Sequence, residues 1–76
     1  MNKERRKGLQ AIHEKITDLR DELELLMGEE EDYRDNMPEN LQGSEKYDRA
    51  NDVCEMLDAA VSDLETVCEN IEYAME

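Results

Sequence analysis

The sequence predicts an all-α fold, an antiparallel helical hairpin with heptad seams that dimerises into a four-helix bundle. Three observations predict it: an apolar stripe with heptad spacing in the first half of the chain, a second stripe in the second half, and a single loop-like segment between them. The 76 residues suffice for a single domain, 1–76. We expect a helix over about 3–36, a loop over about 37–44 and a helix over about 45–75.

The first helix is predicted by residues that recur at alternating steps of three and four. The stripe consists of Leu9, Ile12, Ile16, Leu19, Leu23, Leu26, Glu30, Tyr33 and Met37. Glu30 is its one acidic member, and Gly28 nearby lowers helix stability by about 1 kcal/mol relative to alanine. The helix is expected to end near Asn36, because the residue before a proline is disfavoured in the α region.

The loop is predicted by residues that end and begin helices. Pro38 suits the start of a short helical turn, and Gly43 can close that turn in the left-handed conformation. Ser44 is then expected to cap the second helix, with Glu45 in its first turn.

The second helix is predicted by an unbroken stripe of the same spacing. It consists of Tyr47, Ala50, Cys54, Leu57, Val61, Leu64, Cys68, Ile71 and Met75. A companion column, spaced by seven, runs beside it and consists of Val53, Ala60, Val67 and Ala74. Because this column widens the stripe beyond what one facing helix covers, it predicts a homodimer; the alternative is a docking face for a target.

The two stripes can be matched to each other. Facing residues of an antiparallel hairpin have numbers with a constant sum, and a sum of 80 gives every stripe residue a stripe partner. It pairs Leu26 with Cys54 and Ile12 with Cys68, for example, and it places the turn at Asn40.

The charge of the chain is strongly negative and unevenly distributed. The formal net charge is -13, with six basic and three acidic residues in 1–20 and three basic against 19 acidic residues in 21–76. This balance disfavours nucleic acid and anionic membrane as direct ligands, and favours the basic surface of a partner protein. The basic cluster Lys3–Lys7 is expected to lie beside acids near the end of the second helix; the alternative is contact with nucleic acid.

A candidate partner-binding surface is an acidic face centred on the densest run of charge. Its expected residues are Glu29, Glu30, Glu31, Asp32, Asp35, Glu39, Asp48, Asp52 and Glu55. Carboxylates three and four residues apart on a helix lie about 5–6 Å apart, close to the spacing of phosphates. The functional interpretation is therefore a surface that imitates DNA; the alternative is a solvated face that only keeps the protein soluble.

The residues that could support chemistry do not form a catalytic or metal site. From Asp32 onward the calcium-loop pattern fails, because Met37 stands where the glycine is required. His13 is the single histidine, expected at the surface, so no zinc set and no histidine-based catalytic group is predicted. We expect no cofactor, no metal and no enzymatic activity. Cys54 and Cys68 are expected to be reduced core residues, with a disulfide between two chains as the alternative.

The location expected from the absence of targeting segments is the cytoplasm. No apolar run approaches the 18 residues that a membrane span needs, and the basic start is not followed by the apolar region of a signal peptide.

The chain resembles a group of short acidic helical proteins of bacterial prophages and mobile elements, mostly uncharacterised. The resemblance rests on the opening Met1–Lys7 and on the middle segment Tyr33–Tyr47, which contains Asp-Asn-Met-Pro-Glu-Asn-Leu-Gln. Small acidic phage proteins include inhibitors of nucleases and of CRISPR effectors, some of them DNA mimics. The resemblance therefore implies an anti-defence inhibitor of a nucleic-acid-binding host protein; the alternative is a structural or assembly accessory that forms a dimeric bundle.

Overall fold

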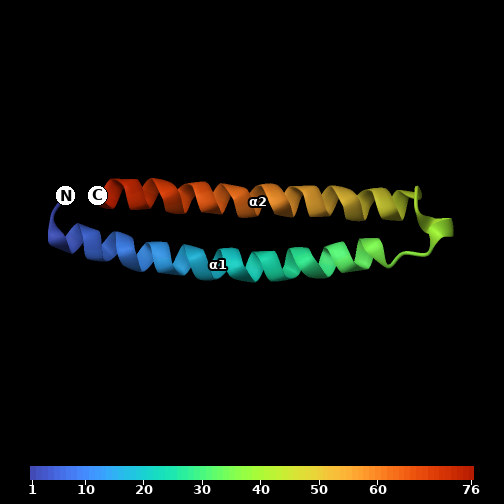
Figure 1. Cartoon of the computed structure of the whole chain (residues 1–76), viewed down its shortest axis with the longest axis horizontal. Coiled ribbons are helices and arrows are strands. Elements are labelled where there is room, and N and C mark those ends of the chain that lie inside the picture. The colour runs from blue at the N-terminus through green and yellow to red at the C-terminus, as the bar shows by residue number, and fades with distance from the viewer.

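The chain folds as a helical hairpin in the computed structural model, which describes all residues, 1–76 (Figure 1). Helix α1 spans Lys3–Asp35, the short 3-10 helix η1 spans Glu39–Leu41, and α2 spans Glu45–Met75. The two long helices run antiparallel, so both termini lie at one end and η1 lies at the other (Figure 1). The hairpin is a rod of 59 × 15 × 13 Å.

The helix ends are fixed by side chains that satisfy free backbone groups. The Asn2 side chain accepts a hydrogen bond from Arg5 N at 2.8 Å, and Ser44 Oγ accepts one from Tyr47 N at 3.3 Å. Gly43 has a φ of 88°, the left-handed conformation that glycine adopts at least cost. The predicted roles of Gly43 and Ser44 are therefore confirmed, whereas the Asn2 cap was not predicted.

The predicted stripe of α2 forms its inner face. All nine residues are buried or half-buried, and four of them, Ala50, Cys54, Val61 and Cys68, are at most 5% exposed. By contrast, α1 contributes no buried residue to the interface. Met37, two residues after the end of α1, is the only other buried residue of the chain. The core is therefore a narrow line of small side chains along α2.

The predicted stripe of α1 is wrong at four of its nine positions. Ile12, Leu19, Leu26 and Tyr33 are between 46% and 57% exposed. The residues that follow them, His13, Arg20, Met27 and Arg34, are half-buried in their place. Both sets alternate with Leu9, Ile16 and Leu23 at steps of three and four. The first set was predicted to face α2 because it is the more apolar. The second set faces α2 instead, since long polar side chains can pack their stems inward and keep their charged ends in water.

The predicted pairing of the helices is also wrong in register. Three polar side-chain contacts join the helices: His13 with Glu72, Thr17 with Cys68, and Arg34 with Asn51. Each pair has a sum of 85, so the expected sum of 80, with its turn at Asn40, does not hold. The shift arises at the turn: Asp35 is level with Ala50, so α2 begins nearer the tip of the hairpin than α1 ends, and the chain after α1 runs on toward η1 (Figure 1).

The shift leaves the first turns of α1 without a facing helix. In the observed register, the last residues of α2 lie level with Gln10, and the start of α1 extends beyond them (Figure 1). The basic residues of Lys3–Lys7 form no ion pair with α2. The expectation that this cluster lies against the acids at the end of α2 is therefore wrong.

Neither helix has a stretch long and apolar enough to cross a membrane.

Candidate interaction surfaces

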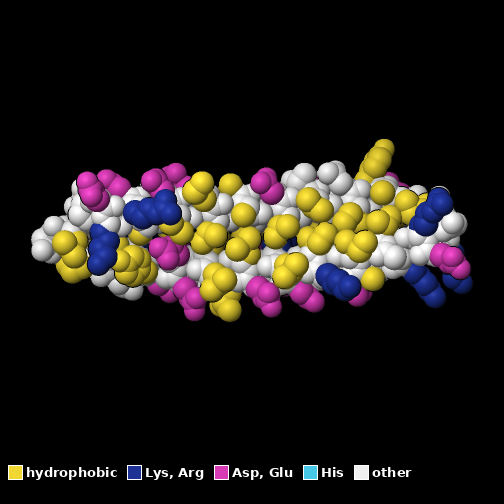
Figure 2. Space-filling view, turned by 180° about the vertical axis from the view of Figure 1, so that it is seen from behind, with side chains coloured by type: hydrophobic (Ala, Val, Ile, Leu, Met, Phe, Trp, Pro, Cys, Tyr) yellow, Lys and Arg dark blue, Asp and Glu magenta, His cyan; other side chains and the backbone are white.

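One side of the hairpin is an apolar face that both helices build. It consists of Ile12, Leu19, Leu26 and Tyr33 of α1 and of the companion column Val53, Ala60, Val67 and Ala74 of α2. None of these eight residues is charged, and the four α1 side chains are about half exposed. Figure 2 shows the result as a band of apolar side chains that runs along the molecule over both helices.

The contacts between the helices show why the two columns share a side. His13, Thr17 and Arg34 reach α2 on the opposite side of the hairpin, where they meet Glu72, Cys68 and Asn51. Each apolar α1 residue precedes a half-buried seam residue by one position, about 100° around the helix. The same relation holds in α2, where Val53 precedes Cys54 and Ala60 precedes Val61. Both columns therefore lie away from the polar contacts.

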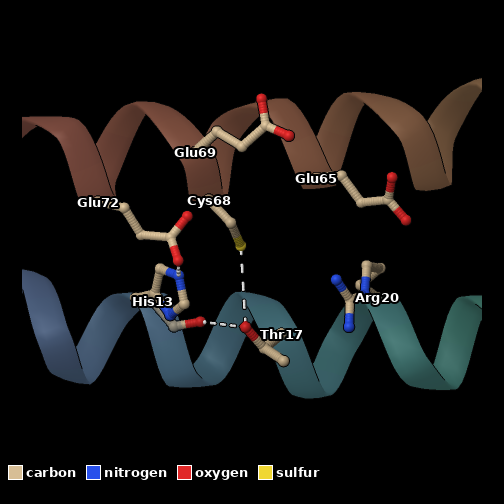
Figure 3. A pocket seen from close by; sticks show the side chains of 7 residues that line it. All are labelled: His13, Thr17, Arg20, Glu65, Cys68, Glu69 and Glu72. Carbon is tan, nitrogen blue, oxygen red and sulfur yellow. Dashed lines mark hydrogen bonds and ion pairs between the residues drawn. The ribbon is translucent and has the colours of Figure 1, made fainter.

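The opposite side carries two open polar grooves between the helices. The first, of about 330 Å³, is lined by His13, Thr17, Arg20, Glu65, Cys68, Glu69 and Glu72 (Figure 3). In it Thr17 Oγ1 donates a hydrogen bond to the His13 carbonyl at 2.9 Å and lies 3.8 Å from Cys68 Sγ. His13 Nε2 lies 3.5 Å from Glu72 Oε1, and the His13 side chain is 20% exposed. His13 is thus a seam residue, and its expected surface position is wrong.

The second groove lies nearer the turn and is built around Arg34. Its lining residues are Met27, Glu31, Arg34, Cys54, Glu55 and Asp58. Arg34 donates to Asp35 Oδ1 at 2.9 Å and to Asn51 Oδ1 at 3.1 Å. The hydrogen bond to Asp35 raises the pKa of Arg34 above its already high value, so this guanidinium is a fixed positive charge beneath the surrounding carboxylates.

The acidic residues concentrate on the side of these grooves. Six line the grooves themselves: Glu31, Glu55, Asp58, Glu65, Glu69 and Glu72. Asp21 and Asp35 bond to the groove arginines Arg20 and Arg34. Three more, Glu14, Glu24 and Asp48, precede Asp21, Glu31 and Glu55 by seven residues and so share their faces. We call these eleven residues the acidic side; it lies opposite the apolar face.

The structure divides the nine residues of the predicted acidic face. Glu31, Asp35, Asp48 and Glu55 belong to the acidic side. Glu30 lies half-buried in the seam, Glu39 begins η1, and Glu29, Asp32 and Asp52 are exposed on the outer flanks of the helices. Sequence reasoning overlooked Asp21 and Glu24, because their face is recognisable only once the correct α1 seam is known. No group of three or more His, Cys, Asp or Glu is arranged to hold a metal ion.

Both cysteines are free thiols in the core, 5% exposed each. Burial raises the pKa of the Cys54 thiol. Because the thiolate is the reactive form, we expect Cys54 in the folded protein to react with iodoacetamide at pH 8 at least about tenfold more slowly than in 6 M urea. Mass spectrometry of the alkylated peptides measures this ratio, and equal rates in both solvents would contradict the buried position.

The same shift gives a pH dependence of stability. The unfolded chain ionises its thiol at the usual pKa of 9.0, below the pKa in the folded state. The contribution of Cys54 is therefore complete below pH 9 and is lost as the pH rises through the raised pKa.

Comparison with protein family models, curated proteins and solved structures finds no significant match.

Proposed function

We propose that this chain is a non-enzymatic interaction protein that acts as a homodimer and presents its acidic side to the basic, nucleic-acid-binding surface of another protein. One observation carries the proposal: apolar and acidic residues lie on opposite sides of one hairpin. Such a molecule can bury one side against a second copy and keep the other free.

The acidic side has the properties of a competitor for nucleic acid. Its eleven carboxylates run along both helices. Asp21 and Asp35 pair with Arg20 and Arg34, Glu72 lies near His13, and the other eight form no ion pair. Carboxylates on neighbouring helical turns are about 5–6 Å apart, and a basic groove that accepts phosphates can accept them too. The hairpin backbone holds them in a fixed row, which lowers the entropic cost of binding.

Dimerisation into a four-helix bundle is the second part of the proposal. Five of 76 residues are buried in the single hairpin, which is a small core for a chain of this length. A second copy seated on the apolar face would cover Leu19, Leu26 and their neighbours and enlarge that core. The acidic sides would then face outward from both surfaces of the bundle.

The resemblance to prophage and mobile-element proteins supports a biological setting for this binding. We propose that the protein acts in the cytoplasm of a bacterial host, as an anti-defence inhibitor of the anti-CRISPR or nuclease-inhibitor type. The partner is then an enzyme or effector whose nucleic-acid groove the acidic side occupies.

A second candidate function is a structural or assembly accessory. The dimeric bundle is then the functional part, and the charge only keeps it soluble. This reading is favoured by Glu29, Asp32 and Asp52, which put further charge on the outer flanks, away from the grooves.

Two variants with equal net charge separate the functions. Glu31→Lys with Glu55→Lys reverses two carboxylates of one groove, and Glu22→Lys with Asp63→Lys reverses two exposed acids outside the acidic side. We expect the first variant, and not the second, to lose about tenfold or more in affinity for a captured nucleic-acid-binding protein. The accessory function predicts that both variants behave like the natural chain.

The binding experiment starts from capture out of a bacterial lysate at low salt and elution at high salt. Each captured protein is then loaded with labelled DNA or RNA, and fluorescence anisotropy follows its release by the natural chain and by both variants. Absence of any salt-sensitive, nucleic-acid-binding partner would contradict the inhibitor function.

A further inference from the structure

We propose that the two copies of the dimer join by their apolar faces with their turns at opposite ends, so that α1 packs on α1 and α2 on α2 of the second copy. The inference rests on the dimer in the proposed function and specifies its geometry. A face-to-face pair of hairpins related by a two-fold axis has two arrangements, turns together or turns apart. Charge, side-chain size and surface shape each distinguish them.

The charge of the hairpin is concentrated at its turn end. Arg20 and Glu65 line the same groove and so lie at one level along the rod. The part toward the termini, 1–20 with 65–76, has six basic and seven acidic residues, a balance of -1. The part toward the turn, 21–64, has three basic and 15 acidic residues, a balance of -12. A dimer with the turns together would place the two turn parts, each of charge -12, side by side. A dimer with the turns apart places each turn part beside a terminal part of charge -1, so the two copies repel each other less.

The side chains of the apolar face fill the interface evenly only with turns apart. In the observed register Ile12 is level with Ala74, and Tyr33 is level with Val53, so both columns span the same length. With turns together, one end layer would hold two isoleucines and two alanines and the other two tyrosines and two valines. With turns apart, both end layers combine one residue of each of these four types. Even layers avoid a cavity at one end and crowding at the other.

The two ends of the rod carry different apolar features. At the end with the termini, the start of α1 carries an apolar hollow of about 320 Å³, lined by Met1, Arg5, Gly8, Leu9 and Ile12. At the other end, Tyr33 is 46% and Leu41 is 39% exposed. With turns apart, the turn of each copy lies level with the hollow of the other, so Leu41 and Tyr33 can cover it. With turns together, hollow would face hollow.

A spin label at the turn tests this geometry directly. We attach it to Asn40→Cys, in the exposed η1, in a background with Cys54→Ala and Cys68→Ala. Distances between the labels of the two copies are measured by pulsed electron paramagnetic resonance. Turns apart predicts a separation of about 50 Å, since each label is about 17 residues of helix from the centre of the apolar face. Turns together predicts less than about 25 Å.

A second position establishes that the dimer is present. Ser62→Cys is exposed near the centre of the rod, and its labels should lie roughly 20–30 Å apart in either arrangement. Asn40→Cys in the natural background, where the two buried thiols are protected from the reagent, repeats the measurement if the alanine substitutions destabilise the chain. A turn-to-turn distance below about 25 Å would overturn the proposed geometry, and loss of any distance at Ser62→Cys would overturn the dimer itself. Neither result depends on partner binding, so failure of the acidic side as a binding surface would be seen separately.

Discussion

We expect that replacing Leu19 and Leu26 together with lysine converts the proposed dimer to a monomer, with a dissociation constant raised by at least about 1,000-fold. The two side chains are 56% and 57% exposed in the hairpin and lie in the middle of the apolar face. Burying a leucine contributes roughly 1.5–3 kcal/mol, and the proposed dimer would bury four of them. The substitution also makes the net charge less negative, so lower repulsion between copies acts against the expected result. Sedimentation equilibrium measures the dissociation constant.

The matched control is Leu25→Lys with Met56→Lys. Both side chains are 70% exposed and lie outside the apolar face, and the change in charge and in apolar surface is similar. This control should associate as the natural chain does. Equal weakening by both pairs would show that association depends on general hydrophobicity, and no weakening by the first pair would show that the apolar face is not the interface.

Replacing Val61 with aspartate will unfold the protein at room temperature. Val61 is 5% exposed at the middle of the α2 seam. A carboxylate there loses its hydration, which is costly for a charge that is not paired. The cost is about 3–5 kcal/mol, a large part of the stability of so small a domain. Far-ultraviolet circular dichroism measures the loss of helix.

Ala59→Asp is the control for this substitution, two residues earlier and exposed. It should retain the helical spectrum, with a melting temperature within a few degrees of the natural chain. A folded Val61→Asp protein with an unchanged melting temperature would contradict the position of Val61 in the core.

The sequence was informative where one arrangement of residues satisfied every constraint. The seam of α2 was predictable because no polar residue competes with it; each of its nine positions is apolar. The turn was predictable because Pro38, Gly43 and Ser44 have backbone requirements that few conformations meet. Two amphipathic helices joined by so short a turn are expected to pack antiparallel.

The α1 seam was not predictable from polarity because two adjacent columns fit the same period. The more apolar column, headed by Ile12, lies on the exposed face, and the column headed by His13 lies in the seam. When two adjacent columns of a helix are both largely apolar, polarity alone does not show which of them faces the other helix. The wrong α1 seam also made the acidic side unrecognisable, because the side of the hairpin on which an acidic residue lies depends on which residues of its helix form the seam.

Two half-buried polar residues of the α1 seam reach α2. Arg34 donates a hydrogen bond to Asn51, and His13 Nε2 lies 3.5 Å from Glu72 Oε1. Arg20, by contrast, pairs with Asp21 of its own helix, and its Nε has no hydrogen-bond partner. The two contacts with α2 also fix the register, because a shift of one heptad would separate each from its partner. The predicted register ignored them, as it counted apolar pairs only.

The claim on which the function and the geometry both depend is that a second copy covers the apolar face. Light scattering of the natural chain at micromolar concentration and moderate salt measures it most directly. We predict a particle of twice the 8.9 kDa chain mass, which dissociates on dilution. A particle of 8.9 kDa that persists at the highest concentrations would contradict the account.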